Sequence, residues 1–228
     1  MNLSENTINV LKNYSQINPS VGFKPGNIIK TISPQKTVMT KATVDETFPS
    51  EGAIYDLNRF LGVLSLFDEP ELFFHDTKVV VQKDKKKIDY TFADPQMIIN
   101  PPEKEISFPD PEVSVEIYWS EMQQVLRAAA VMGLPEIAIV GSGGEISLSA
   151  IDSKNPTADV YSSDVGETKD SFQFIFKVEN LKLMNFNYLV EISDLGIAKF
   201  TSVNTYGPKL EYWIATEEHL HLKNKVNY

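Results

Sequence analysis

The chain has 228 residues, a length that fits one large domain or two small ones, and 42% of them are hydrophobic, enough for a packed core. Its 21 lysines and arginines and 31 aspartates and glutamates give a net charge of −10, which argues against a protein that coats nucleic acid or an anionic membrane with its whole surface. The absence of cysteine excludes disulfides, thiolate metal sites and a cysteine nucleophile. The first residues lack a leader pattern, and no apolar run reaches the roughly 18 residues of a spanning helix. We therefore expect a soluble intracellular protein.

The first predicted element is a helix over residues 4–17, with Ser4 as its N-cap. Its polar half contains Lys12 and Asn13. Its apolar half consists of side chains that recur at helical spacing: Ile8, Val10, Leu11, Tyr14 and Ile17.

A second helix is predicted over residues 56–66, with Arg59 on its polar side. Two strands, over residues 78–82 and 88–92, close this half of the chain. The lysines between them predict a solvent-exposed hairpin tip, with a phosphate contact as the minority interpretation. The inward side of the helix is formed by Leu57, Phe60, Leu61 and Leu64.

A proline-rich segment divides the chain, since five of its 13 prolines lie between residues 95 and 111. Proline fixes the backbone and cannot donate a hydrogen bond, so we expect an extended connector at about residues 94–112 between domains 1–108 and 109–228. Its apolar residues include Ile106, Phe108 and Pro109. They either pack on their own domain or help to form a groove for a partner.

The same order of elements returns after the connector. A helix is predicted over residues 120–132, with Ser120 as its N-cap and Arg127 on its polar side. A hairpin with a glycine turn follows over residues 137–150, and then a short helix over residues 179–184. Strands over 189–193 and 210–215 end the chain. The sequence therefore predicts an α+β fold of two similar domains, each with two helices packed on antiparallel strands.

Each predicted helix has one acid near its start and one base further on. The acids suit the positive end of the helix dipole. The bases form a shared, weakly basic surface, although a solvated helix face explains each one separately. They are Lys12, Arg59, Arg127 and Lys182, with Lys177 just before the fourth helix as a fifth candidate.

No arrangement of residues predicts catalysis. The glycine run at 141–144 lacks the Gly-Lys-Ser/Thr sequence of a phosphate loop. His219 and His221 lack a third metal ligand nearby, and the acids at 68–71 fit a turn better than a general-acid pair. We therefore expect a binding scaffold, not an enzyme, with no metal and no cofactor.

Several segments resemble a known family. Residues 53–66 (AIYDLNRFLGVLSL), the helix of residues 3–18 and residues 123–127 (QQVLR) are similar to the sliding clamps, or DNA polymerase processivity factors, of T-even-like bacteriophages. Residues 106–109 (ISFP) resemble the interdomain connector of that family. The length and the repeated layout agree with it as well.

The resemblance implies a DNA-clamp fold that closes as a homotrimer into a ring, with helices around a central hole for duplex DNA. An ATP-driven clamp loader would open and load the ring, which would tether the replicative DNA polymerase in the cytoplasm of the infected bacterial host. Late-transcription factors are further implied partners. The five bases would then face DNA phosphates, and partner peptides would dock near Ile106, Phe108 and Pro109.

The alternative hypothesis is an acidic, β-rich phage interaction or assembly scaffold that does not bind DNA. Subunit stoichiometry separates the two hypotheses, because only the clamp requires a closed trimer.

Overall fold

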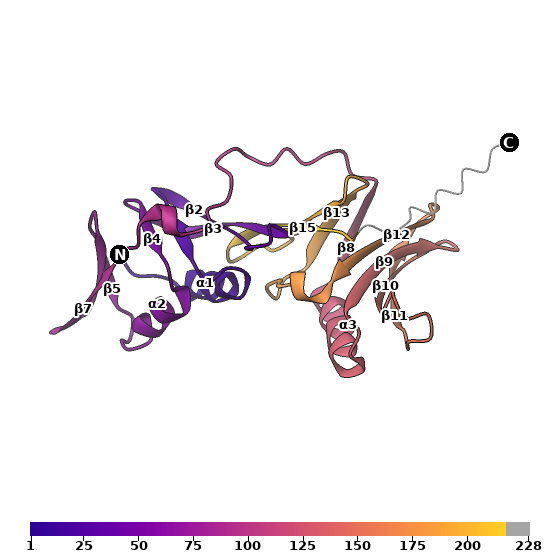
Figure 1. The fold of residues 1–228 in the computed structure, drawn as a ribbon, viewed down its shortest axis with the longest axis horizontal. Coiled ribbons are helices and arrows are strands. Elements are labelled where there is room, and N and C mark those ends of the chain that lie inside the picture. The colour runs from indigo at the N-terminus through magenta and orange to yellow at the C-terminus, as the bar shows by residue number, and fades with distance from the viewer. Residues whose placement is uncertain (218–228) are drawn as a thin grey trace. The chain divides into compact units, whose positions relative to one another are not determined.

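The computed structural model describes residues 1–217 (Figure 1). These residues form two compact units. Unit 1 comprises Met1–Ile106 and Asn204–Tyr212, and unit 2 comprises Ser107–Val203 and the chain from Trp213 onward. No helix in the described range is long and apolar enough to cross a membrane.

Unit 1 begins with a helix, continues through four strands and a second helix, and ends with a three-stranded meander (Figure 1). The four strands hydrogen-bond in the order β4-β1-β2-β3, and the meander in the order β5-β6-β7. The elements are α1 (Glu5–Ile17), β1 (Val21–Phe23), β2 (Gly26–Ile32), β3 (Val38–Phe48), β4 (Gly52–Ile54), α2 (Leu57–Leu64), β5 (Glu71–Phe74), β6 (Lys78–Lys83), β7 (Lys86–Thr91) and the 3-10 turn η1 (Pro95–Met97).

Unit 2 repeats this plan after one additional strand. Its four strands hydrogen-bond in the order β12-β9-β10-β11, and its final meander is β13-β14-β15. The elements are β8 (Val113–Ile117), α3 (Trp119–Met132), β9 (Glu136–Ser142), β10 (Glu145–Ile151), β11 (Tyr161–Glu167), β12 (Phe172–Lys177), the 3-10 turn η2 (Val178–Asn180), β13 (Tyr188–Ser193), β14 (Ile197–Ser202) and β15 (Lys209–Ala215).

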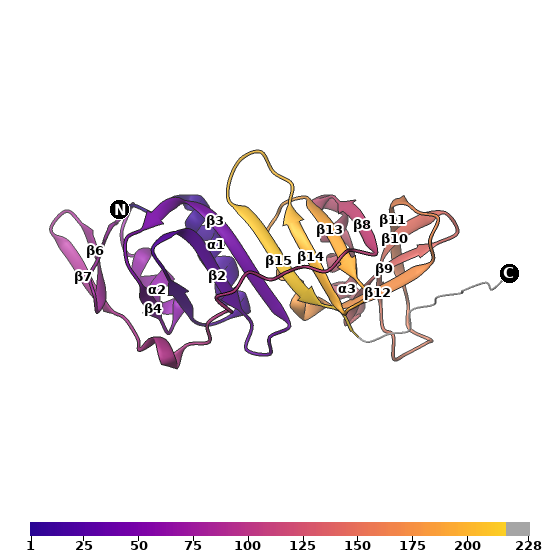
Figure 2. The same cartoon turned by 90° about the horizontal axis from the view of Figure 1, so that it is seen from above.

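The strand orders confirm the predicted α+β fold of two similar domains. In both units the strand that follows the first helix occupies the second place of its four-stranded set, and the fourth strand occupies the outer place beside it. The last strand, β15, contributes to both units, because its residues up to Tyr212 belong to unit 1 and its later residues to unit 2. Figure 2 shows the strands of both units from above.

The prediction of two helices in each domain is wrong for unit 2. Residues 1–217 contain three α-helices, and the predicted helix over 179–184 is only the 3-10 turn η2 followed by irregular chain. Leu181 and Leu183 are buried whereas Lys182 between them is half-exposed. This alternation has the period of an extended segment, so the two leucines enter the core without a helix.

Two details of the first and third helices also differ from the predictions. Asn13, placed on the polar side, is buried because its Oδ1 accepts a hydrogen bond of 2.9 Å from the Tyr212 hydroxyl. The third helix begins one residue earlier than predicted, with Tyr118 rather than Ser120 as its N-cap. There the Glu121 carboxylate accepts a 3.3 Å hydrogen bond from the Tyr118 backbone N–H, the reciprocal bond that a glutamate in the first turn makes to an N-cap residue.

The α1 helix follows the prediction. Ser4 is its N-cap and accepts a hydrogen bond from the Thr7 backbone N–H at 3.2 Å. Tyr14 lies fully buried and donates to the Ile29 carbonyl at 3.1 Å, which fixes α1 on β2. The apolar side of α1 thus faces the strands, and its opposite side faces solvent.

The predicted glycine hairpin is confirmed between β9 and β10. Gly143 and Gly144 both have positive φ, of 66° and 100°, a backbone conformation that strongly favours glycine. The pairing of Ser142 with Glu145 then fixes the register of the hairpin.

Candidate functional site

Three of the five predicted bases lie on the exposed sides of the three α-helices. Lys12 is exposed on α1, Arg59 on α2 and Arg127 on α3. Each helix buries its opposite side, as α2 does with Phe60, which is 1% exposed and packs against the Tyr90 ring with centroids 5.1 Å apart. The amphipathic pattern therefore directs each base into solvent.

The surroundings of these bases are polar and almost uncharged. The α1 and α3 helices each contain one acid and one base, and α2 contains only Arg59. Uncharged side chains complete the exposed surface, and they include Asn6, Gln16, Asn58, Ser120 and Gln124. The result is a set of helix surfaces that are polar and close to neutral on an acidic protein.

The other two predicted bases have different settings. Lys177 ends β12, and its ammonium lies 3.2 Å from the Glu217 carboxylate, so that its charge is partly compensated. Lys182 lies in the irregular chain after η2 and is half-exposed. The structure therefore places three of the bases on helices but not Lys177 or Lys182.

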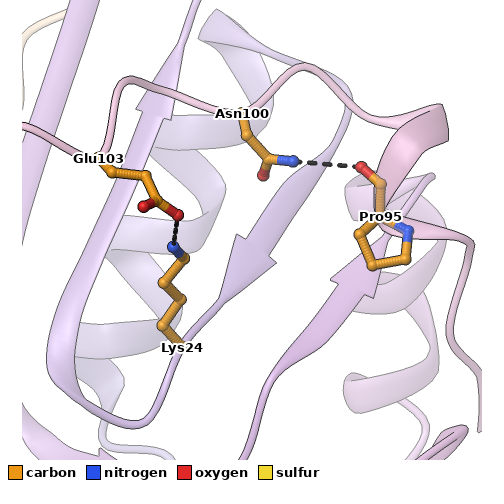
Figure 3. Close-up of polar contacts among 4 residues, drawn as sticks. All are labelled: Lys24, Pro95, Asn100 and Glu103. Carbon is orange, nitrogen blue, oxygen red and sulfur yellow. Dashed lines mark hydrogen bonds and ion pairs between the residues drawn. The ribbon is translucent and has the colours of Figure 1, made fainter.

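The connector is tied to unit 1 along its first half. Ile98 is 8% exposed, and the Asn18 side-chain amide donates to the Ile99 carbonyl at 3.3 Å. The Asn100 amide donates to the Pro95 carbonyl at 3.2 Å, and Lys24 pairs with Glu103 at 2.7 Å (Figure 3). Gly22 permits this path, because a Cβ there would lie 2.8 Å from the Asn100 Oδ1.

The predicted partner-binding residues follow this anchored segment. Ile106, Phe108 and Pro109 are each half-buried and lie outside helices and strands. Four exposed acids, Glu103, Glu105, Asp110 and Glu112, flank them, with Lys104 as the one base among residues 103–112. The connector therefore combines apolar side chains with an acidic setting.

Sequence reasoning missed a pocket between α1 and α2. Its volume is about 560 Å³, and Lys12 lies at its edge. In the sequence, the apolar sides of the two helices predict that the helices pack together, but they do not predict a pocket between them. The apolar part of its lining is Leu3, Ile8, Leu61, Leu64, Phe67, Pro70 and Leu72.

A carboxylate from β3 holds the first turn of α1. The Glu46 side chain accepts hydrogen bonds from the Ser4 backbone N–H and the Thr7 hydroxyl. Burial alone would raise the pKa of Glu46, but these hydrogen bonds outweigh it and lower that pKa below its usual range. The α1 terminus thus depends on an ionised acid that is 39 residues distant from Thr7 in the sequence.

Among residues 1–217, no group of three or more His, Asp or Glu side chains is arranged to hold a metal ion. His219 and His221, the pair considered from the sequence, lie outside the described residues.

Two family models match the chain in succession. The model described as "DNA polymerase processivity factor" matches residues 4–100, and the one described as "gp45 sliding clamp, C terminal" matches residues 114–218.

Named relatives agree with these models. The chain is 34% identical to a sliding clamp of Vibrio phage KVP40, over 95% of this chain and 99% of that protein. It is 30% identical to a sliding clamp of Enterobacteria phage T4, over 95% and 97%. In fold it resembles A. fulgidus PCNA, solved with the C-terminal region of FEN-1, with a TM-score of 0.72, 13% identity, and coverage of 96% of this chain and 98% of that one.

Proposed function

Because the chain belongs to the sliding-clamp family of DNA polymerase processivity factors, we propose that three copies of it close into a ring around duplex DNA and tether the replicative DNA polymerase. The domains of this ring are residues 1–108 and 109–228, with the connector at about 94–112. The observation that carries the proposal is the repeat of strand order in the two units, since a ring of this kind needs similar domains that join edge to edge.

The strand order indicates which edges close the ring. The outer edge of β3 is paired with β15, the last strand of the second meander. Their counterparts are β11, which holds the place of β3 in unit 2, and β7, which ends the first meander. Within residues 1–217, no strand and no backbone hydrogen bond covers the outer edge of β7 or of β11. Pairing of β11 in one copy with β7 in the next would repeat the β3–β15 arrangement and hide both edges.

The DNA-facing residues in this proposal are Lys12, Arg59, Arg127, Lys182 and, as a weaker contributor, Lys177. Lys12, Arg59 and Arg127, in three copies, supply nine bases from helices, and Lys182 adds three more. This is a small number for the length of duplex in such a hole. Each neutralised phosphate adds affinity and salt dependence, so a sparse lining permits sliding while the closed ring prevents dissociation.

Partner peptides dock, in this proposal, on the connector at Ile106, Phe108 and Pro109. The support is a half-buried apolar segment that begins directly after an anchored one, so that little backbone ordering is required upon binding. A peptide from the polymerase, the ATP-driven clamp loader and late-transcription factors would share this surface in the cytoplasm of the infected host.

The proposal is tested on the purified full-length protein in two steps. Light scattering should give the mass of a trimer at tens of micromolar. Processive synthesis on primed circular DNA should then require this protein, the polymerase and the loader with ATP. A monomer throughout that range would contradict the ring, and a trimer that never stimulates synthesis would favour the scaffold alternative.

A further inference from the structure

We propose that opposite charges on the edges of β7 and β11 select head-to-tail pairing between copies of this chain, and that this is the role of the lysine-rich hairpin at residues 83–87. The inference rests on the proposed ring and concerns how its subunits choose the correct edge.

The β7 edge is basic. The hairpin between β6 and β7 has lysines at 83, 85, 86 and 87, with Asp84 at its turn in a left-handed conformation (φ 55°). Lys85, Lys86 and Lys87 are exposed. The nearest acid along the strand, Asp89, is engaged by Lys78 at 2.6 Å. The start of β7 therefore presents an excess of positive charge.

The β11 edge is acidic. Asp164 and Glu167 lie on β11, and Glu145 lies on the neighbouring strand β10. All three side chains are exposed, and within the described part of the chain no ion pair or hydrogen bond engages their carboxylates. The end of β11 therefore presents uncompensated negative charge.

Each edge contains a like-charge pair that is unfavourable in the isolated subunit. Lys83 lies directly opposite Lys86 across the β6–β7 ladder, and Glu145 lies directly opposite Glu167 across the β10–β11 ladder. Like charges in this position destabilise a sheet. A third such pair, Lys30 opposite Lys41, is compensated by an ion pair of 2.5 Å between Lys41 and Glu211.

The two uncompensated pairs lack an opposite charge from a neighbouring strand, which Lys41 has in Glu211. Glu211 belongs to β15, the strand that covers the β3 edge in unit 1. At the β3 edge, therefore, the covering strand brings the opposite charge. We infer that β7 and β11 compensate each other in the same way when two copies meet.

The direction of the strands fits this pairing. In an antiparallel arrangement the start of β7, next to the lysines, lies beside the end of β11, next to Glu167 and Glu145. A two-fold antiparallel pair of β7 edges would place the lysines beside the uncharged end of the other β7 strand, at Tyr90 and Thr91. A two-fold pair of β11 edges would bring the two central Asp164 side chains together. Neither two-fold dimer therefore gains the compensation of opposite charges that the β7–β11 contact provides. The charges thus favour the head-to-tail contact from which a closed ring is built.

The test uses three charge-reversal variants of the full-length chain and measures subunit mass against concentration by sedimentation. The first variant has Lys86→Glu and Lys87→Glu, the second has Asp164→Lys and Glu167→Lys, and the third has all four substitutions. The first two should raise the apparent dissociation constant of the trimer about tenfold. The third should restore most of the wild-type affinity, because both edges have changed sign together.

Salt and a matched control complete the experiment. Raising the ionic strength from about 0.05 M to 0.5 M should raise the dissociation constant of the wild-type trimer. The difference in dissociation constant between the wild type and the first two variants should then become smaller. A Lys36→Glu and Lys104→Glu variant, which lowers the net charge by the same amount as the first variant but at exposed sites away from both edges, should assemble like the wild type. If the wild type is a trimer and all three variants have its dissociation constant, the proposed charge selection is wrong but the proposed ring is not contradicted. If the wild type forms no trimer at low salt, both proposals fail.

Discussion

The second helical position of the repeat differs between the two units. In unit 1 it holds α2, an eight-residue helix whose N-cap Asp56 accepts a 2.9 Å hydrogen bond from the Arg59 backbone N–H. In unit 2 it holds η2, a single 3-10 turn, followed by irregular chain. The apolar residues of α2 recur three and four apart, whereas Leu181 and Leu183 alternate. This position of the repeat therefore supplies apolar side chains to the core, and both the helical spacing of α2 and the alternating spacing of Leu181 and Leu183 do so.

The largest expected effect concerns the packing of α2. Phe60→Ala removes a side chain that is 1% exposed and stacked edge-on against Tyr90, so we expect a loss of about 3–5 kcal/mol in the free energy of unfolding. Leu181→Ala in the corresponding segment should cost less, about 2–3 kcal/mol, because leucine fills a smaller volume. Urea unfolding of both variants measures the difference. Equal losses would show that the two positions are buried equivalently despite their different backbones.

The next effect concerns function. Arg59→Glu reverses an exposed helix charge, whereas Lys182→Glu reverses a half-exposed charge outside any helix. We expect Arg59→Glu, like Arg127→Glu, to reduce loader-dependent retention on circular DNA several-fold with less than about 0.5 kcal/mol of stability lost. Lys182→Glu should reduce retention less. Lys36→Glu is the matched control, because it reverses an exposed lysine outside the helices; Lys223, which also lies outside the predicted helices, is not among the described residues. If Arg127→Glu retains DNA as well as Lys36→Glu, the helices do not face the duplex.

The N-cap of α2 gives a smaller effect. Asp56→Ala should cost about 1 kcal/mol, because the Arg59 N–H loses its acceptor. Glu179→Ala should change stability by less than about 0.5 kcal/mol, since this exposed acid lies in a single turn that has no side-chain cap. Thermal unfolding of the two variants distinguishes a capped helix from a turn. Equal melting temperatures of the two variants would contradict the difference in capping between α2 and η2.

The smallest effect is the pH dependence of the α1 terminus. Since the pKa of Glu46 is lowered in the folded chain, its contribution is present above the unfolded pKa of about 4.3 and is lost as the pH falls through the folded value. We expect wild-type stability to decline more steeply than that of Glu46→Gln in this acidic range. Melting temperatures at pH 3 to 7 test this. Parallel profiles would show that Glu46 does not titrate in this window.

Much of the fold follows from periodicity alone. The helices α1, α2 and α3, the glycine hairpin and the closing strands appear within a few residues of their predicted bounds, because each has a complete local pattern. The fourth helix failed because a short apolar segment with mixed spacing fits a helix and an extended chain about equally well. The tertiary contacts of Leu181 and Leu183 decided between them.

The settings of the candidate site residues could be predicted from the sequence only in part. The predicted bases on α1, α2 and α3 lie in solvent because the opposite side of each helix is apolar, but Lys182 depended on a helix that does not form. The burial of Asn13 depends on Tyr212, which is 199 residues away, and no local pattern contains that information. The pocket between α1 and α2 was missed for the same reason.

The shared strand β15 also bears on how the chain folds during synthesis. Unit 1 contains residues 204–212, so its Tyr212–Asn13 and Glu211–Lys41 contacts form only after the chain has left the ribosome beyond residue 212. Contacts of such high sequence separation slow folding, because a long loop must close before they contribute. Until then the edge of β3 in the nascent N-terminal half is uncovered. We expect a protein truncated before residue 204 to aggregate rather than to form a stable N-terminal domain.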